Sequence, residues 1–444
     1  MMNTPIVDFV SSYAARNQAR FHMPGHKGKS FLGCEPYDIT EIFGADTLYS
    51  ADGIINESEN NASELFGTAH TFYSTEGSTL AIKAMLTLAI SGKKPFVLAA
   101  RNVHKSFVYA CALLDIDVAW IYPSEKEHLC SCRISAQDVE NALNELSSLP
   151  TALYLTTPDY LGQMLDVEAI SKVCKKYGVT LLVDNAHGAY LNFLPKSRHS
   201  VSLGADICCD SAHKTLPVLT GGAYLHISKT ADRDYVSRAR ETLSLFSSTS
   251  PSYLVLESLD LCNRYLSENY PQRLAETVEK LDMLKRKLSD HGFTVPDTEP
   301  LKLVINAAEY GYTGCELAEI LRKQEIELEF SDDEYAVFMV TPENTDAELE
   351  LLFKALISIS RKNKISKETL SLNGNAEQVM SIREAIFSPS EIIDVADAIG
   401  RICASPTVSC PPAIPIAVSG ERITNTAIKL FERYGIRKIS VVKK

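Results

Sequence analysis

Along the first two thirds of the chain, apolar residues follow two alternating spacings. Short apolar runs of strand length stand between segments in which apolar residues recur every three or four positions, the spacing of a helix with one buried face. Strands are expected at 95–100, 152–156, 179–183, 205–209 and 222–227, and helices at 79–90 and 167–177. This alternation predicts an α/β fold whose mainly parallel sheet is covered on both faces.

A second, smaller α/β part is expected after long helices at 253–290, where Pro271 interrupts the helical pattern. Its expected elements are strands near 301–305 and 337–340, a helix at 315–324, and a helix after Pro342 capped by Asn344 or Thr345. Residues 390–402 also have helical spacing. We therefore expect an N-terminal arm (1–50), a large domain (51–290) and a C-terminal α/β region (291–444), with a linker at 361–377.

Charge and composition restrict the partners of the protein. The chain has 444 residues, and its 44 Lys and Arg against 56 Asp and Glu give a net charge of −12. Such an acidic protein is a poor candidate for binding nucleic acid or an anionic membrane. The sequence contains no apolar run long enough to span a membrane and no secretory signal. Eleven scattered cysteines fit reduced thiols, and we expect a cytoplasmic protein.

One lysine has neighbours that suit covalent catalysis. Lys214 follows an apolar run together with Ser211 and His213, and Asp184 ends the run at 179–183. Ligands of α/β sheets bind at the carboxyl ends of strands, where both Lys214 and Asp184 are expected. A lysine that bonds to the aldehyde of pyridoxal 5′-phosphate, and a carboxylate that keeps the pyridine nitrogen protonated, are what this cofactor needs. Taken alone, Lys214 would be a surface lysine after a strand.

Two further segments fit the same cofactor. Gly77, Ser78 and Thr79 open a helix, and backbone N–H groups at a helix N-terminus bind phosphate well; the alternative is plain helix capping. His104 follows another expected strand, where its imidazole would stack on the pyridine ring or, alternatively, bond to the loop backbone. The sequence HLCSC at 128–132 has no second Cys or His pair at zinc spacing, so we expect no metal there.

Five separated motifs together resemble the Orn/Lys/Arg decarboxylases, which are pyridoxal phosphate enzymes of fold type I. The motifs are RFHMPGHK at 20–27, RNVHKS at 101–106, DNAH at 184–187, SAHK at 211–214 and CPPAIP at 410–415. The resemblance implies a role for each site residue. Lys214 would carry the cofactor, Asp184 would bind the pyridine nitrogen, and His104 would stack on the ring. The residues that would hold the phosphate are Ser78, Thr79, Ser211 and His213, with Gly77 in the same turn. Ala186 and His187 would lie close to the cofactor.

The resemblance also implies a homodimer, or an oligomer built from dimers, with shared active sites. Thr249 or Ser250 of the neighbouring subunit would complete each site. The chain begins almost at the first motif, so we expect the short form of the family, without the N-terminal wing domain. Three positions depart from the family pattern: the 220–222 stretch lacks a common Gln, Asn185 replaces a common acidic residue, and Cys209 replaces a small residue that is not a thiol.

The predicted function is decarboxylation of a basic amino acid in polyamine metabolism, with arginine, giving agmatine, ahead of lysine or ornithine. Acidic candidates for the substrate side chain are Glu329, Asp332, Asp333 and Glu421. The main alternative is an aminotransferase on the same fold, whose carboxylate clamp would be Arg322, Arg383 or Arg401. A catalytically inactive binding or regulatory protein is a second alternative.

Overall fold

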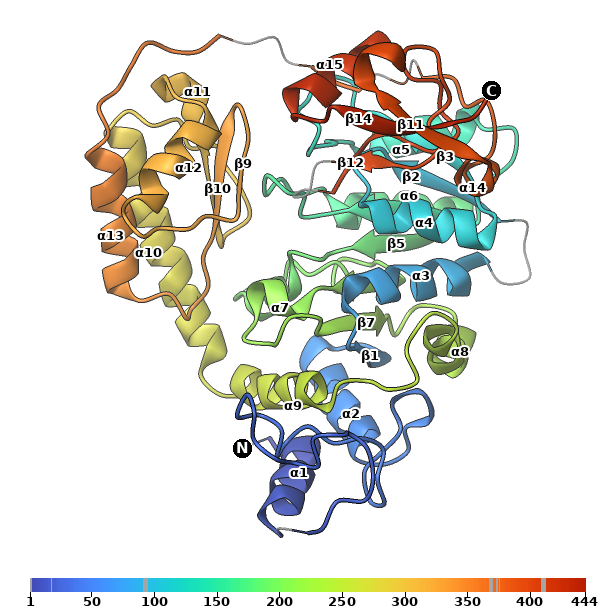
Figure 1. Cartoon of the computed structure of the whole chain (residues 1–444), viewed down its shortest axis with the longest axis vertical. Helices are drawn as coiled ribbons and strands as arrows, with labels where there is room; N and C mark the ends of the chain where they lie inside the picture. Colours follow the sequence, from blue (N-terminus) through green and yellow to red (C-terminus); the bar gives the residue numbers. More distant parts are fainter. Residues whose placement is uncertain are drawn as a thin grey trace. The chain divides into compact units, whose positions relative to one another are not determined.

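The computed structural model describes residues 2–16, 18–90, 95–366, 370–372, 374, 376–408 and 413–444. It divides into two compact units, each built from two stretches of chain (Figure 1). The first unit is Met1–Gly92 with Cys174–Arg273, and the second is Lys93–Val173 with Leu274–Lys444. The expected arm, large domain and C-terminal region remain a prediction.

The sheet of the first unit has four strands in the order β1-β7-β6-β5. Their bounds are β1 (His70–Ser74), β5 (Thr180–Asp184), β6 (Ile207–Asp210) and β7 (Ala223–Ile227). β5 and β6 are parallel, with Asp184 opposite Cys209, whereas β7 runs antiparallel to both β6 and β1. Because β5 and β6 are parallel, the residues that follow them emerge at the same edge of the sheet.

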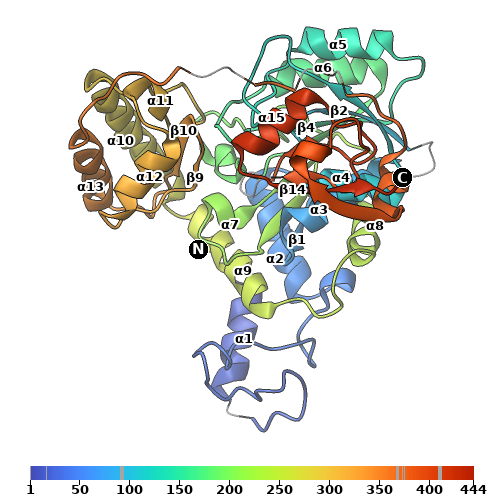
Figure 2. The same cartoon turned by 45° about the horizontal axis from the view of Figure 1, so that its top comes forward.

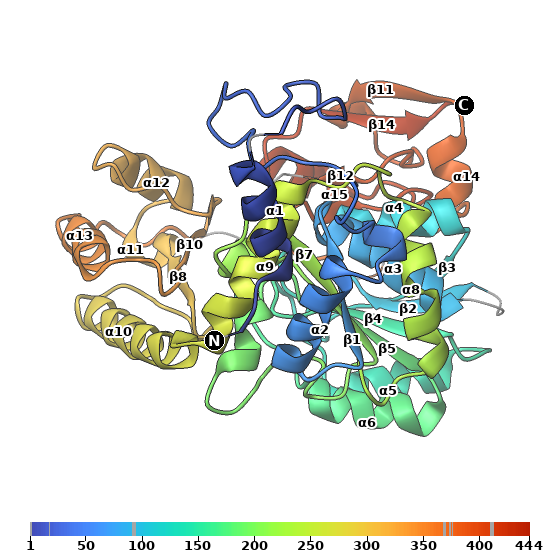
Figure 3. The same cartoon turned by 90° about the horizontal axis from the view of Figure 1, so that it is seen from below.

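Helices cover this sheet. α3 (Gly77–Ile90) is rich in buried apolar residues and packs on all four strands and on α8 (Arg233–Ser244). α1 (Pro5–Ala15), α2 (Ile54–Phe66) and α9 (Tyr253–Ser267) pack on one another, as Figure 3 shows for α1 and α9. The remaining helical turns are η1 (Leu48–Ser50), η2 (Ala189–Phe193) and α7 (Ala212–Thr215).

The second unit contains three parallel strands in the order β4-β2-β3. They are β2 (Phe96–Ala100), β3 (Asp117–Ile121) and β4 (Ala152–Thr156), with helices α4 (Lys105–Leu114), α5 (Ala136–Glu145) and α6 (Val167–Tyr177). The parallel pairs in the two units confirm the expected α/β class with a mainly parallel sheet. The carboxyl end of β2 leads into a short turn at 101–104 before α4.

A small antiparallel sheet, β8-β10-β9, forms the expected second α/β part. Alternate residues of β8 enter two cores: Leu303 and Ile305 pack with the surrounding helices, and Val304 packs with the C-terminal segment. Figure 2 shows α10–α13 gathered around this sheet. The elements are β8 (Lys302–Asn306), β9 (Phe330–Ser331), β10 (Tyr335–Met339), α10 (Tyr270–Asp290), α11 (Ala307–Tyr310), α12 (Gly314–Arg322) and α13 (Asp346–Ile357).

The C-terminal segment corrects one prediction. Residues 390–402 were expected to form a helix, which is wrong: β11 (Ser390–Asp394) pairs antiparallel with β14 (Lys438–Val442), and η3 (Val395–Asp397) follows. Adjacent β-branched residues, Ile392 and Ile393, suit a strand, and the distant β14 supplies the backbone partners. The remaining elements are α14 (Ile382–Phe387), β12 (Thr407–Val408), β13 (Pro415–Ala417) and α15 (Asn425–Arg433).

The structure also bears on the expectations for Pro271, the linker, the cysteines and membrane spans. Pro271 is the second residue of α10 and does not break it, since α9 has already ended at Ser267. The described residues of the expected linker at 361–377 form no helix or strand, and 367–369, 373 and 375 lie outside the described residues, as do 410–412 of the CPPAIP motif. The ten cysteines described by the structure are all free thiols. No helix in the described ranges is both long and apolar enough to cross a membrane.

Candidate active site

Lys214 lies at the carboxyl end of β6, in the single helical turn α7. The turn ends at Leu216, which is extended (φ −117°, ψ 157°), because the residue before a proline, here Pro217, disfavours the helical conformation. The Nζ of Lys214 lies 3.0 Å from Nε2 of His187, an imidazole that is only 5% exposed. The structure therefore brings the predicted lysine and His187 into direct contact.

Asp184 is the last residue of β5 and is buried. One carboxylate oxygen, Oδ1, accepts a hydrogen bond from the N–H of Ala186 at 3.2 Å and faces the thiol of Cys209 at 3.7 Å. Burial and the carboxylates of Asp184 and Asp210 raise the pKa of Cys209 well above its ordinary value. Cys209 therefore remains a neutral thiol beside the strand-end carboxyl group of Asp184.

The expected phosphate site is assembled from two distant segments. The hydroxyl of Ser211, after β6, donates to the hydroxyl of Ser78 in the first turn of α3 at 2.8 Å. Gly77 opens this helix with φ +70°, a conformation that disfavours residues with a side chain. Its N–H donates to the carbonyl of Gly221 at 2.7 Å, so it does not point at a ligand. The Ser78 hydroxyl and the helix N-terminus provide donors for an anion, and the Ser211 hydroxyl would become a third donor by rotating away from Ser78. Thr79 lies exposed in the same turn.

The glycine pair after the lysine explains the missing Gln. A Cβ on Gly221 would lie 2.9 Å from the carbonyl oxygen of Thr75, and one on Gly222 would lie 2.2 Å from a methyl of Val218. The carbonyl of Gly222 accepts both the backbone N–H of His213 at 3.2 Å and its imidazole Nδ1–H at 2.9 Å. This loop therefore holds α7 and the start of α3 through the carbonyls of Gly222 and Gly221.

His213 is fixed in one tautomer by that contact, because a carbonyl only accepts hydrogen bonds. Burial, and then the positive charge of Lys214, hold the pKa of His213 below its usual value, although the bond to Gly222 acts in the opposite direction. The neutral imidazole carries its proton on Nδ1. Its Nε2 must therefore gain a proton before it donates to a phosphate.

Sequence reasoning missed a buried polar cluster next to these residues. Asp210 accepts hydrogen bonds from Nδ2 of Asn185 (2.6 Å), Nε2 of His199 (2.9 Å) and Nε2 of His226 (3.0 Å), and all four residues are fully buried. Burial acts to raise the pKa of Asp210, but the two imidazoles hold it well below its usual range. The available signal was a charged residue, Asp210, that ends an apolar run. The Asn185–Asp210 bond ties the residue after Asp184 to the residue before Ser211.

The remaining predicted residues are placed as follows. His104, in the second unit, caps α4: its Nδ1 accepts from the N–H of Ser106 at 3.1 Å. The N–H of Ser248 donates to Oε1 of Glu76 at 2.7 Å. This contact places the exposed Thr249 and Ser250 next to the turn before α3 of their own chain.

The acidic candidates for substrate recognition are engaged elsewhere. Oδ2 of Asp332 pairs with Nε2 of His128 at 2.7 Å, the Glu329 carboxylate accepts from the hydroxyl of Tyr160, and Glu421 pairs with Arg101. The proposed arginine clamps are also engaged. Arg322 pairs with Glu327, Arg401 pairs with Glu391, and Arg383 donates to the carbonyls of residues 112 and 113.

The first unit therefore offers a lysine amine, a strand-end carboxylate and a hydroxyl-lined helix N-terminus, a donor set that fits the aldehyde, ring nitrogen and phosphate of pyridoxal 5′-phosphate. The structure of a lysine decarboxylase from Francisella novicida superposes with a TM-score of 0.83 at 17% identity, covering 99% of this chain and 81% of that chain. This likeness shows the shared fold, that of the fold type I pyridoxal phosphate enzymes.

Sequence comparison narrows the class. The family model for the Orn/Lys/Arg decarboxylase major domain matches residues 4–301. An arginine decarboxylase from Halalkalibacterium halodurans is 30% identical over 95% of this chain and 91% of its own length, and a lysine decarboxylase from Pseudomonas aeruginosa is 22% identical over 64% of this chain and 43% of its own. The chain belongs to the Orn/Lys/Arg decarboxylase family. It is a carboxy-lyase, and the cofactor of its family is pyridoxal 5′-phosphate, as predicted.

Proposed function

We propose that this enzyme decarboxylates arginine to agmatine and CO2 and supplies polyamine synthesis, with lysine and then ornithine as the next candidate substrates. The observation that carries the reaction is the placement of Lys214 and Asp184 at the carboxyl ends of two adjacent parallel strands, β6 and β5. The preference for arginine is supported by the arginine decarboxylase that matches 95% of the chain at 30% identity. The lysine decarboxylase match is weaker and shorter.

The proposed chemistry assigns a task to each residue. Lys214 would hold the aldehyde carbon of the cofactor between turnovers and would give up that position to the α-amine of the substrate. His187, at 3.0 Å from the amine, accepts the proton that the lysine must lose before it attacks. Asp184 holds a proton on the pyridine nitrogen. When bound, the cofactor accepts the electron pair released as the α-carboxylate leaves as CO2.

The phosphate is the anchor of the cofactor in this proposal. The hydroxyls of Ser78 and Ser211 and the N–H groups of the first turn of α3 are the donors that bind it. Protonation of His213 at Nε2 would add a charged donor. As the family resemblance implies, His104 would stack on the pyridine ring and hold its orientation. Lys214 is the amine that would release the product by taking back the aldehyde carbon of the cofactor.

An aminotransferase is the alternative on the same fold, since it uses the same lysine and aspartate. It requires an arginine that holds the α-carboxylate in the plane favouring Cα–H cleavage. Arg322, Arg383 and Arg401 are each engaged in an ion pair or with backbone carbonyls, which supports decarboxylation. An inactive homologue is disfavoured by the retention of Lys214 and Asp184.

We also propose a cytoplasmic homodimer whose sites are shared. Support comes from the arm at 21–43, which exposes a series of large apolar side chains that a monomer would leave in water. They are Phe21 (95% exposed), Met23, Phe31, Leu32 and Phe43 (104%). Light scattering of the purified protein should give twice the chain mass, and F21S together with F43S should shift it toward the monomer. A monomeric wild type would refute this assembly.

The test of the reaction offers arginine, lysine and ornithine in parallel to the cofactor-loaded enzyme and identifies the amine by mass spectrometry. We expect agmatine from arginine at the highest kcat/KM. K214A is the inactive control, and K175A, which removes an exposed lysine of α6, is the matched control that retains activity. Cadaverine or putrescine as the main product would reassign the substrate. A keto acid without CO2 would establish the aminotransferase.

A further inference from the structure

The turn that carries His104 is held by a segment more than 300 residues further along the chain. This turn, residues 101–104, joins β2 to α4, and loops at the carboxyl ends of parallel strands are where ligand-binding residues lie. The first helical N–H groups of α4 have no partner within the helix. The N–H of Lys105, the residue after His104, donates to the carbonyl of Ala413 at 2.9 Å. The end of the turn next to His104 is thus held by a hydrogen bond to the distant residue Ala413.

Ala413 is itself held in an unusual conformation. Its φ is +59°, in the left-handed region that residues with a side chain rarely adopt unless their surroundings impose it. It is buried, and the following residues form β13. The contact at Lys105 therefore depends on how the 413–421 segment is anchored.

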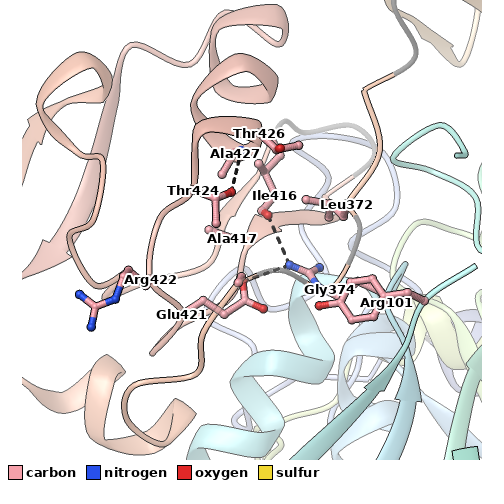
Figure 4. Close-up of a pocket in the computed structure, with 12 residues that line it drawn as sticks. Arg101, Leu372, Gly374, Ile416, Ala417, Glu421, Arg422, Thr424, Thr426 and Ala427 are labelled. Atoms are coloured by element: carbon pink, nitrogen blue, oxygen red, sulfur yellow. Dashed lines mark hydrogen bonds and ion pairs between the residues drawn. The ribbon is translucent and has the colours of Figure 1, made fainter.

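Arg101 provides that anchor at the near end of the turn. Its guanidinium is 4% exposed and donates through Nη1 to the carbonyl of Pro415 at 2.8 Å and through Nη2 to that of Ile416 at 3.3 Å. It also lies over the ring of Trp120, 5.3 Å from the ring centre. Figure 4 shows the guanidinium between the carbonyl of Ile416 and the carboxylate of Glu421. One side chain from the turn thus contacts three positions of the segment.

Glu421 supplies the charge that keeps Arg101 there. Its Oε2 lies 3.3 Å from Nη2 of Arg101 and accepts the N–H of Val418 at 2.7 Å, and both ionised side chains are 4% exposed. Burial acts to lower the pKa of Arg101, but the Glu421 carboxylate and the Tyr122 hydroxyl raise it above its ordinary value. A buried guanidinium without a counterion would move toward water, and its two bonds to the segment would be lost.

We infer that Glu421 is a positioning residue that acts through Arg101 on the turn carrying His104, and so sets the orientation of that imidazole toward the cofactor ring. This inference rests on the proposed stacking role of His104. Glu421 touches neither cofactor nor substrate in this account. Its effect is carried by the Arg101 contacts and by the Lys105–Ala413 bond, which share one short segment.

The test is a double-mutant cycle with E421Q and H104A in the full-length protein. E421Q keeps the size and the acceptor for Val418 but removes the charge. The readouts are the dissociation constant of pyridoxal phosphate, the visible circular dichroism of the bound cofactor and kcat. The matched control is E299Q, which removes the acid of another buried ion pair, Glu299–Lys302 at 3.0 Å.

We expect E421Q to weaken cofactor binding about 3- to 30-fold, the range of couplings carried by such contacts, and to change the circular dichroism. In the H104A background the same substitution should alter neither by more than about twofold, because its effect passes through His104. E299Q should lower the melting temperature but leave the dichroism unchanged. If E421Q does not fold, R101K is the second variant: it keeps the positive charge but loses the paired N–H donors of the guanidinium. R101K should weaken cofactor binding and change the dichroism in the presence of His104 but not in the H104A background.

Two results would overturn the inference. The first is an equal weakening by E421Q with and without His104. The second is a lowered melting temperature with unchanged cofactor affinity and dichroism, as for E299Q. Failure of the proposed function is seen separately, since the wild-type protein would then bind no cofactor at Lys214 or release no amine, whichever residue stands at 421.

Discussion

Glu257 in α9 should make the protein more stable in mild acid than in mild base. Its side chain is 9% exposed, and its Oε1 has no hydrogen-bond partner among the residues that the structure describes. Burial, followed by repulsion from Asp260 and Asp38, raises the pKa of Glu257 from 4.5 to about 8. Between these values the folded protein keeps a proton that the unfolded chain releases. The contribution of Glu257 to the free energy of unfolding is therefore greatest below pH 4.5 and is lost as the pH rises through 8.

The size of the effect follows from the shift. Each unit of pKa shift corresponds to about 1.4 kcal/mol, so a rise from 4.5 to about 8 would be worth about 5 kcal/mol if fully realised. Residual access of water screens the charge, and we expect roughly 2 kcal/mol. For a chain of this length that corresponds to a shift in Tm of roughly 2–4 °C.

The assay is calorimetric unfolding of wild type and E257Q from pH 5 to pH 9. Gln is neutral and nearly isosteric, so E257Q should match the wild type at pH 5 and exceed its Tm at pH 9. E279Q, at an exposed position of α10, is the control and should follow the wild type throughout. Parallel Tm curves for E257Q and wild type would show that Glu257 does not hold a proton in the folded protein.

Four further predictions concern the active site. K214A should lose the borohydride-reducible cofactor bond and lower kcat by at least about 10³-fold; an unchanged rate would contradict its role, and K175A is the control. D184A should retain cofactor but lose about 10²- to 10³-fold in kcat, whereas a loss of affinity alone would place Asp184 elsewhere. S78A with S211A should weaken pyridoxal phosphate binding about 10- to 100-fold, without the same loss for pyridoxal; equal losses would refute the phosphate site. D210N should destabilise the protein by about 3 kcal/mol, since two buried imidazoles lose their charged acceptor, and an unchanged Tm would contradict that network.

Local patterns predicted the α/β class and five of the seven strands β1–β7. The strand at 152–156 and the helix at 167–177 have the predicted bounds, because their apolar spacing agrees with what the tertiary structure requires. β1 escaped prediction because His70, Thr71 and Ser74 are polar. The buried Thr71 bonds to His226 of β7 at 2.9 Å, a partner more than 150 residues away. β11 was predicted as helix for a similar reason, since β14 decides its conformation.

The candidate site shows the same contrast between local and distant contacts. The positions of Asp184 and Lys214 at strand ends were predicted from apolar runs that each lead into a short motif, and their roles belong to the proposed function. The pairs Asn185–Asp210 and Arg101–Glu421 could not, since 25 and 320 positions separate their members and neither pair leaves a periodic trace. Glu421 was one of four acidic candidates for the substrate side chain, with a solvated surface charge as the alternative, and the structure places it in a buried ion pair with Arg101.

The hydrogen bond from Asn185 to Asp210 restricts how relatives of this enzyme can differ. An Asp at position 185 would place a second carboxylate 2.6 Å from one that two imidazoles already keep ionised, and the two acids could then coexist only by sharing a proton. Homologues with an acidic residue at 185 should therefore carry a different residue at 210 or a cation nearby. Positions 185 and 210 should therefore change together during evolution, because one hydrogen bond links the ends of β5 and β6.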